Sequence, residues 1–312
     1  MAPVLAPLQI IGGNGGGRSE VRGWEKGQRI RKIQVFVGGW QIKAIRLWLT
    51  GDGDFQEFGS PQGCPSREFT FDDNERVTSM SLWGNGAGTR AGAIKFRTSA
   101  DREFDYGMTD WGRKREYRID VGSGIMVGAV YDSGLDIDAQ GYWFLSSSVV
   151  NTHFSSLRYG HFRGNPVIET LDSYRQTNRS SAPISWTFSG EKEVTMSKKW
   201  TSSKEHFFKA NAIIKAGVPF FNVKASLEWH TRETSSDERV SEERRKLSWS
   251  NGGQLSPGQS ISLEAITRKG TLHLPYTGIV TIHLANGAKF TYQETGTFTG
   301  IRYSSVEIRN TK

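Results

Sequence analysis

Three short loops of this sequence combine glycine with carboxylate, amide or hydroxyl side chains. They are GGNGG at residues 12–16, GNGAGT at residues 84–89 and SGLDID at residues 133–138. Glycine lets backbone N–H groups come close to a ligand, and a carboxylate can accept hydrogen bonds from two neighbouring hydroxyls. Each loop taken singly is an ordinary hairpin turn, but together the three loops meet the requirements of a site for a sugar.

The sequence lacks the usual signatures of catalysis and of cofactor binding. It has no G-x-S-x-G or H-E-x-x-H motif, and its six histidines are scattered. The run GSGIMVG at residues 122–128 leads into a predicted strand, whereas a dinucleotide site needs a helix at that point. The acidic pair Asp136 and Asp138 is more typical of groups that accept hydrogen bonds than of acid–base catalysts. We therefore expect no enzymatic activity, no metal and no cofactor.

The net charge of +8 could suit a polyanionic partner, but the basic and acidic side chains are interleaved along most of the chain. No recognition helix, zinc finger or base-stacking strand accompanies the charge, so we expect no nucleic-acid partner.

Several features bear on the compartment in which the protein works. Cys64 is the single cysteine, which excludes an intrachain disulfide and fits a reducing compartment. The start, MAPVLAPLQII, has no basic region and is interrupted by prolines, so no signal peptide is predicted. No run approaches the roughly 18 consecutive apolar residues of a membrane-spanning helix. We expect a soluble protein, either cytoplasmic or secreted by a non-classical route.

The elements that must position the three loops are predicted to be β-strands. Short runs rich in Val, Ile, Phe, Trp and Tyr alternate with turn clusters such as GDGD and DDNE, and no window has helical periodicity. The pattern predicts an all-β fold of antiparallel sheets, with early strands near Ile33–Val37, Ala44–Leu49, Phe69–Phe71, Ala93–Arg97 and Met126–Tyr131.

The composition changes near residue 146, where the glycine turns become rare and longer strands rich in Ser and Thr begin. This change predicts two domains, residues 1–146 and residues 147–312. Within the second, the charged run SSDERVSEERRK at residues 235–246 is expected to be a solvated loop or helical turn.

The first domain resembles the jacalin-like lectin family. The resemblance rests on GGNGG near the start and on MVGAVYDSGLDIDAQGYWFL at residues 126–145, in which Gly134 to Asp138 fit the family's G-x-x-x-D loop. It implies a three-sided β-prism that binds mannose-type or galactose-type sugars without metal. It also implies a role for each residue of the site: Asp138 accepts from sugar hydroxyls, the backbone at Leu135 and Asp136 donates, Gly16 closes the site, and Gly88 and Thr89 form a third wall.

The segment FFKANAIIKAGVPFFNVKASLEWH at residues 207–230 alternates apolar and polar side chains on both sides of a short apolar stretch. Each arm is close to the roughly 9–11 residues that a membrane-spanning β-strand requires. A half-buried hairpin of a soluble protein shows the same alternation, so the pattern alone leaves both interpretations open. A membrane hairpin would need several copies to close a barrel, because open sheet edges do not occur in hydrocarbon.

The second domain resembles the aerolysin-type pore-forming module. The matching segments are KKWTSSKEHFFKANAIIKAGVPFFNVKASLEWHTRE, with a predicted tip at Gly217–Phe221, and LSPGQSISLEAI after it. The resemblance implies an inserting hairpin at about residues 195–235. The lipid-facing residues of its two arms would be Phe208, Ala210, Ala212, Ile214, Ala216, Val223, Ala225, Leu227 and Trp229, and the inserting tip between the arms would include Val218, Pro219, Phe220 and Phe221.

The pairing of these two domains is similar to that of the natterin-like proteins. This similarity implies an elongated β-sheet module after the prism and a function as a glycan-targeted pore former. The protein would be a monomer or dimer in solution and would assemble into a homo-oligomeric ring in the bilayer of a target cell. Two alternatives remain open: a lectin that agglutinates without making pores, and a kininogenase of the natterin type, for which no catalytic triad is visible in the sequence.

Overall fold

The computed structural model describes residues 2–160, 166–202, 212–221, 229–236 and 240–311, and almost all of its regular structure is β-strand. A short 3-10 helix, η1 (Gly23–Lys26), is the exception. The prediction of an all-β fold is therefore confirmed. Within the described residues, no helix is both long enough and apolar enough to cross a bilayer.

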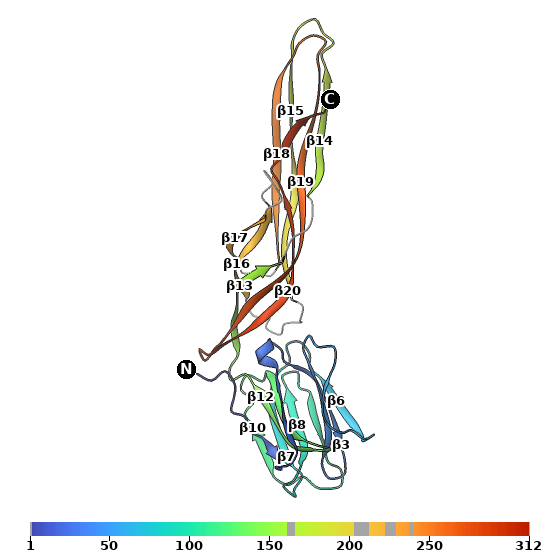
Figure 1. Ribbon diagram of the computed structural model, residues 1–312, viewed down its shortest axis with the longest axis vertical. Helices are drawn as coiled ribbons and strands as arrows, with labels where there is room; N and C mark the ends of the chain where they lie inside the picture. Colours follow the sequence, from blue (N-terminus) through green and yellow to red (C-terminus); the bar gives the residue numbers. More distant parts are fainter. Residues whose placement is uncertain (1, 161–165, 203–211, 222–228, 237–239, 312) are drawn as a thin grey trace. The chain divides into compact units, whose positions relative to one another are not determined.

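The chain forms two compact units, and the first contains Met1–Phe154 together with Ile279–Glu294. Three four-stranded antiparallel sheets make up its prism (Figure 1). The first sheet consists of β1 (Ile11–Gly12), β12 (Ile137–Phe144), β11 (Met126–Ser133) and β2 (Gly17–Arg22). The second consists of β10 (Glu116–Ile119), β7 (Val77–Gly84), β8 (Ala91–Thr98) and β9 (Glu103–Gly107). The third consists of β5 (Gln56–Gly59), β4 (Ile42–Leu49), β3 (Ile30–Val37) and β6 (Ser66–Thr70).

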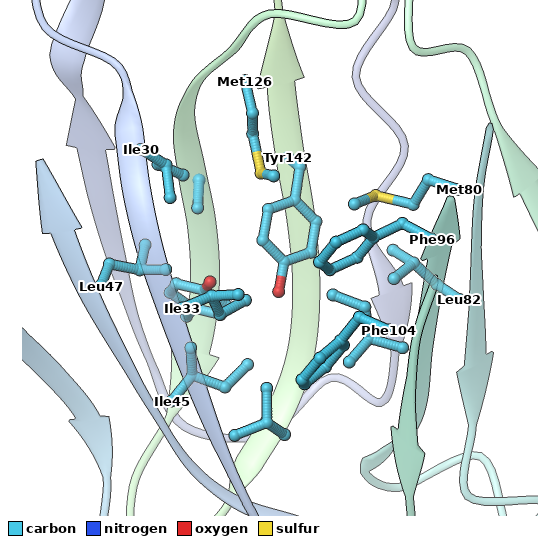
Figure 2. Close-up of a cluster of buried hydrophobic side chains, with 14 of the residues drawn as sticks. Ile30, Ile33, Ile45, Leu47, Met80, Leu82, Phe96, Phe104, Met126 and Tyr142 are labelled. Carbon is cyan, nitrogen blue, oxygen red and sulfur yellow. The ribbon is translucent and has the colours of Figure 1, made fainter. Parts of the chain in front are cut away.

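The prism core forms because each sheet turns one apolar face inward. Figure 2 shows Ile33 and Ile45 from the third sheet, Phe96 and Phe104 from the second, and Tyr142 from the first around one shared interior. The Phe96 and Phe104 rings stack with centroids 5.1 Å apart. Burial of these faces drives the three sheets together, and the loops at the ends of the strands are thereby held in fixed positions.

A nine-stranded sheet contains the remaining strands. In order along the sheet, the main path is β17 (Trp229–Ser236), β16 (Ala212–Phe221), β13 (Val149–Tyr159), β19 (Ser260–Leu284), β20 (Lys289–Tyr303), β15 (Ile184–Ser202) and β18 (Val240–Leu255). Two further strands pair with β19, namely β14 (Val167–Thr177) and β21 (Glu307–Asn310). In the second compact unit, Phe188, Trp249, Leu263 and Ala265 form an apolar cluster.

The prediction of a loop or helical turn at residues 235–246 is wrong for its described part. Residues 240–246 belong to β18, whose register with β15 pairs Lys246 with Glu193. The Lys246 Nζ lies 3.0 Å from a carboxylate oxygen of Glu191. Cross-strand ion pairs of this kind allow a charged sequence to form a solvated strand, which the charge pattern alone does not reveal.

Candidate functional site

The three glycine-rich loops meet at one end of the prism. They connect β1 to β2, β7 to β8 and β11 to β12. The Gly13 N–H donates to the Asp138 carbonyl oxygen at 2.8 Å, and Gly13 lies so close to the Thr89 backbone that a Cβ at residue 13 would overlap it. The structure therefore brings together loops that are separated by about fifty to seventy residues of sequence.

Asp138 is the buried carboxylate at the centre of this cluster, with 4% of its surface exposed. Its Oδ1 lies 2.6 Å from Nη1 of Arg90, whose side chain is 38% exposed. Burial raises the pKa of Asp138, the nearby Asp136 and Asp132 carboxylates raise it further, and the positive charge of Arg90 opposes the rise. The net effect is an aspartate that takes up a proton at a higher pH than usual.

Asp136 lies beside Asp138 but has more partners. It is paired with Lys43, and its Oδ2 lies 3.4 Å from Nε of Arg90. Burial alone would raise the pKa of Asp136, but hydrogen bonds from Lys43 and Gln41 and the charge of Lys43 outweigh burial and lower it. Neighbouring carboxylates thus have pKa values shifted in opposite directions, and Arg90 links the two.

The rim of the site is formed by solvent-exposed residues. Leu135 is 69% exposed, and its carbonyl oxygen accepts a hydrogen bond from the Ser60 N–H at 3.2 Å. The Gly134 N–H donates to the Asp136 carbonyl oxygen at 3.1 Å, which closes the turn. At Gly88, which has a positive φ of 74°, a Cβ would meet nothing within 4 Å, so this part of the wall is open.

The loop at residues 84–89 is shaped by Asn85, which is 4% exposed. Its Oδ1 accepts hydrogen bonds from the N–H groups of Ala87 and Thr89, at 3.2 and 3.4 Å. A cavity of about 300 Å³ lies beside this loop and is lined by residues that include Gly12, Gly86 and Lys114. The site is thus a shallow polar surface bordered by a small cavity.

The structure gathers all the residues predicted for the sugar site at this end of the prism: Gly16, Gly88, Thr89, Gly134, Leu135, Asp136 and Asp138. Sequence reasoning missed Arg90, Lys43 and Asn85. Arg90 directly follows the predicted third wall, and a buried carboxylate requires a cation or several donors nearby, so Arg90 could have been found from its position. Together these groups offer acceptors and charged donors to a polyhydroxylated ligand. No group of three His, Cys, Asp or Glu residues suited to a metal ion occurs among the described residues.

Gly16 sets the floor of the site, and its replacement is expected to destabilise the prism. It has φ of +73°, and a Cβ at this residue would lie 2.5 Å from Oδ2 of Asp138 and 2.6 Å from the Ser133 backbone carbon. In Gly16→Ala, the left-handed conformation alone costs roughly 1–2 kcal/mol, and the overlap adds to this cost. We expect the melting temperature to fall by several degrees.

The neighbouring variant Gly17→Ala is the matched control, because a Cβ at residue 17 would come no closer than 3.9 Å to Ser133 O. Thermal unfolding followed by circular dichroism compares the two variants. Equal melting temperatures would show that the loop rearranges freely around residue 16.

The residues predicted to contact lipid are only partly within the described chain. Phe208, Ala210, Val223, Ala225 and Leu227 lie outside the described residues. Ala212, Ile214 and Ala216 lie in β16, which agrees with the strand predicted there, and Trp229 is the first residue of β17.

The predicted tip at Gly217–Phe221 is wrong, because these residues continue β16 and pair with Trp229–Glu233 of β17. Glycine and proline favour turns in the sequence, but Pro219 is paired opposite Thr231 within the strand. Pairing with neighbouring strands has overridden the local turn preference.

Comparison with known proteins agrees with this architecture. Residues 8–143 match the Jacalin-like lectin domain family. The crystal structure of lamprey immune protein matches with a TM-score of 0.84 and 31% identity, over 100% of this chain and 99% of that chain. Wild-type Malaysian banana lectin is 22% identical, with a TM-score of 0.36, over 46% of this chain and 99% of that one. Frutapin, a lectin from Artocarpus incisa, is 20% identical, with a TM-score of 0.37, over 46% of this chain and 99% of that one. No curated protein sequence matches the chain. The chain thus belongs to the family of the lamprey immune protein, and its first unit contains a jacalin-like lectin domain.

Proposed function

We propose that this protein binds glycans on a cell surface and then assembles into a pore in the membrane beneath them. The jacalin-like domain over residues 8–143 supports the first step, and the convergence of Asp136, Asp138 and Arg90 at the loop end of the prism supplies the chemistry. The similar lamprey protein is an immune protein, which supports a role against foreign or altered cells.

The proposed glycan site uses charged hydrogen-bonding groups. Asp138 and Asp136 accept from adjacent sugar hydroxyls, while Arg90 and the backbone at Leu135 and Asp136 donate. Because Arg90 is more exposed than Asp138, an incoming sugar meets the guanidinium first. The ligands we propose are mannose-type or galactose-type glycans, bound without metal and without a catalytic step.

The proposed pore uses the strands around residues 195–236 from each copy of a ring. In β16 the apolar residues Ala212, Ile214, Ala216, Val218 and Phe220 recur at every second position. The register with β17, however, pairs Val218 with Arg232 and Phe220 with His230. Directly opposite residues of an antiparallel pair share a face, so this register does not align an apolar face on both strands. Insertion would therefore require β16 and β17 to change register or partners, and the pairing seen here belongs to the form before assembly.

The pH dependence of glycan binding follows from the raised pKa of Asp138. The ionised group accepts hydrogen bonds from hydroxyls more strongly than the protonated group does, and its pKa lies above the ordinary aspartate value of 3.8. As the pH falls, Asp138 becomes protonated before an ordinary aspartate does, and binding should decline at that higher pH. Titration of binding to immobilised glycan from pH 7 to pH 3 measures this decline, and in Asp138→Asn the corresponding step should be absent. A wild-type profile that declines only below 3.8 would contradict the prediction.

Release of a dye from liposomes tests the proposed function as a whole. Vesicles that carry mannose-terminated or galactose-terminated glycolipids are compared with vesicles of the same phospholipids alone. Leakage confined to the glycan-bearing vesicles would support a glycan-targeted pore. Aggregation of these vesicles without leakage would favour a lectin that only cross-links, and equal leakage from both kinds would show that glycan binding does not direct insertion.

A further inference from the structure

Two exposed tryptophans stack on each other at the surface of the prism. Trp40 lies in the turn between β3 and β4, and Trp111 lies in the loop between β9 and β10. Their ring centroids are 6.0 Å apart with an interplanar angle of 29°, and 56% and 42% of their surfaces are exposed. Large exposed aromatic surface is costly in water, and a patch of it commonly marks a place where a ligand or partner binds.

The two loops that carry the tryptophans are joined by their backbones. The Asp110 N–H donates to the Gly39 carbonyl oxygen at 2.9 Å. The Asp110 carboxylate also packs against Gly39 so closely that a side chain at residue 39 would overlap it. The Thr109 hydroxyl donates to the same carboxylate at 2.8 Å. These contacts between the two loops therefore hold the two indole rings next to each other.

The tryptophan pair lies at the same end of the prism as the candidate glycan site. The side chain of Gln41, the residue after Trp40, helps to lower the pKa of the Asp136 carboxylate, and Lys43, two residues further along, is paired with that carboxylate. On the other side, the stem of Lys114, three residues after Trp111, packs against Gly86 of the loop at residues 84–89. Consecutive Cα atoms are only about 3.8 Å apart, so the indole of Trp40 begins next to a residue that contacts the site.

We propose that Trp40 and Trp111 form a platform for a second sugar ring of an oligosaccharide whose first ring is held at Asp136, Asp138 and Arg90. A pyranose has a face of C–H groups that can pack on an indole, while its hydroxyls remain at the edge in water. The inference rests on the proposed glycan binding and extends it: the preferred ligand is an oligosaccharide and not a single sugar.

An oligosaccharide fits this surface better than a lipid bilayer does. The aromatic pair adjoins a polar cluster in which the carboxylates of Asp136 and Asp138 are already matched by Lys43 and Arg90. Such groups offer hydrogen bonds to hydroxyls, whereas a bilayer would require a broader apolar patch. Trp40, Trp111 and Leu135 are the large apolar residues exposed at this end among the described residues.

Substitution of the two tryptophans distinguishes binding of the second sugar ring from binding of the first. In Trp40→Ala and Trp111→Ala, affinity for oligosaccharides on a glycan array should fall about tenfold, the loss of about 1.4 kcal/mol. Affinity for methyl α-mannoside and methyl β-galactoside, which have one ring, should not change. Phe55→Ala is the matched control, because Phe55 is also exposed but lies in the β4–β5 connection at the opposite end of the prism. It should leave both affinities unchanged.

A measurement on the unaltered protein supports the same test if the alanine variants fold poorly. Saturating oligosaccharide should change the tryptophan fluorescence, the methyl glycosides should not, and Trp40→Phe should reduce the change. Unchanged oligosaccharide affinity in folded variants would overturn the platform. So would variants that bind oligosaccharides normally but no longer bind glycan-free phospholipid vesicles. If the unaltered protein bound no glycan at all, the proposed function itself would fail.

Discussion

Asp138→Asn is expected to weaken glycan binding on the order of 10–100-fold while the prism stays folded. Hydrogen bonds to a charged group contribute about 1.5–3 kcal/mol each, and the substitution removes the charge without changing the shape of the side chain. It also removes the ion pair with Arg90, whose Nη1 lies 2.6 Å from Oδ1 of Asp138. Isothermal titration with methyl glycosides, or a glycan array, measures the loss.

Asp120→Asn provides the control for this prediction. Asp120→Asn is the same substitution at the other end of the prism, where Oδ1 of Asp120 accepts a hydrogen bond from the Gly122 N–H at 2.9 Å. Its replacement should leave glycan affinity unaltered. If Asp138→Asn keeps its melting temperature and still binds as tightly as the unaltered protein, the glycan site must lie elsewhere on the prism.

The strands of the prism could be predicted because their signal is local. The run Ala44–Leu49 falls within β4 and Ala93–Arg97 within β8, each within two residues of the observed ends. Alternation between apolar and polar residues follows directly from the geometry of a half-buried strand. The division into three sheets is not local, and it was expected only through the resemblance to jacalin-like lectins.

The three loops of the candidate glycan site were singled out from the sequence, but the cationic side chains that pair with their carboxylates were not. Asp136 pairs with Lys43, which is 93 residues away in sequence, and with Arg90, which is 46 residues away. A buried carboxylate predicts that a cation is near, and Arg90 is a candidate because it directly follows the predicted third wall, but nothing in the local pattern selects Lys43 from among the 40 basic residues. Only the packing of the three sheets decides this.

The misplaced turn at Gly217–Phe221 has a different cause. Glycine and proline favour turns when local energies decide, but each preference is worth about 1 kcal/mol or a few at most, and a long sheet supplies many hydrogen bonds. β16 continues through Pro219 while pairing with β17. The pairing of β16 with β17 bears directly on the proposed pore, because insertion would have to start from this register.

Ala216→Arg is expected to abolish pore formation and to preserve glycan binding. Ala216 belongs to the set of alternating apolar residues in β16, and in a membrane barrel this set faces lipid. An arginine there costs roughly 2–4 kcal/mol near the bilayer midplane, and every subunit of the ring contributes the cost again. Single-channel recording in planar bilayers and dye release from glycan-bearing vesicles should both show no activity.

Lys215→Glu is the matched variant, because adjacent residues of a strand point to opposite faces. If Ala216 faces lipid, residue 215 faces the lumen, so pores should still form and their preference between anions and cations should shift toward cations. Glycan affinity and the oligomeric state in solution, measured for both variants, show whether each has folded. Normal conductance of Ala216→Arg would place β16 outside the membrane. If both variants fail equally because they misfold, the alternation in this strand is that of a half-buried strand in a soluble sheet. The protein would then act as a lectin alone.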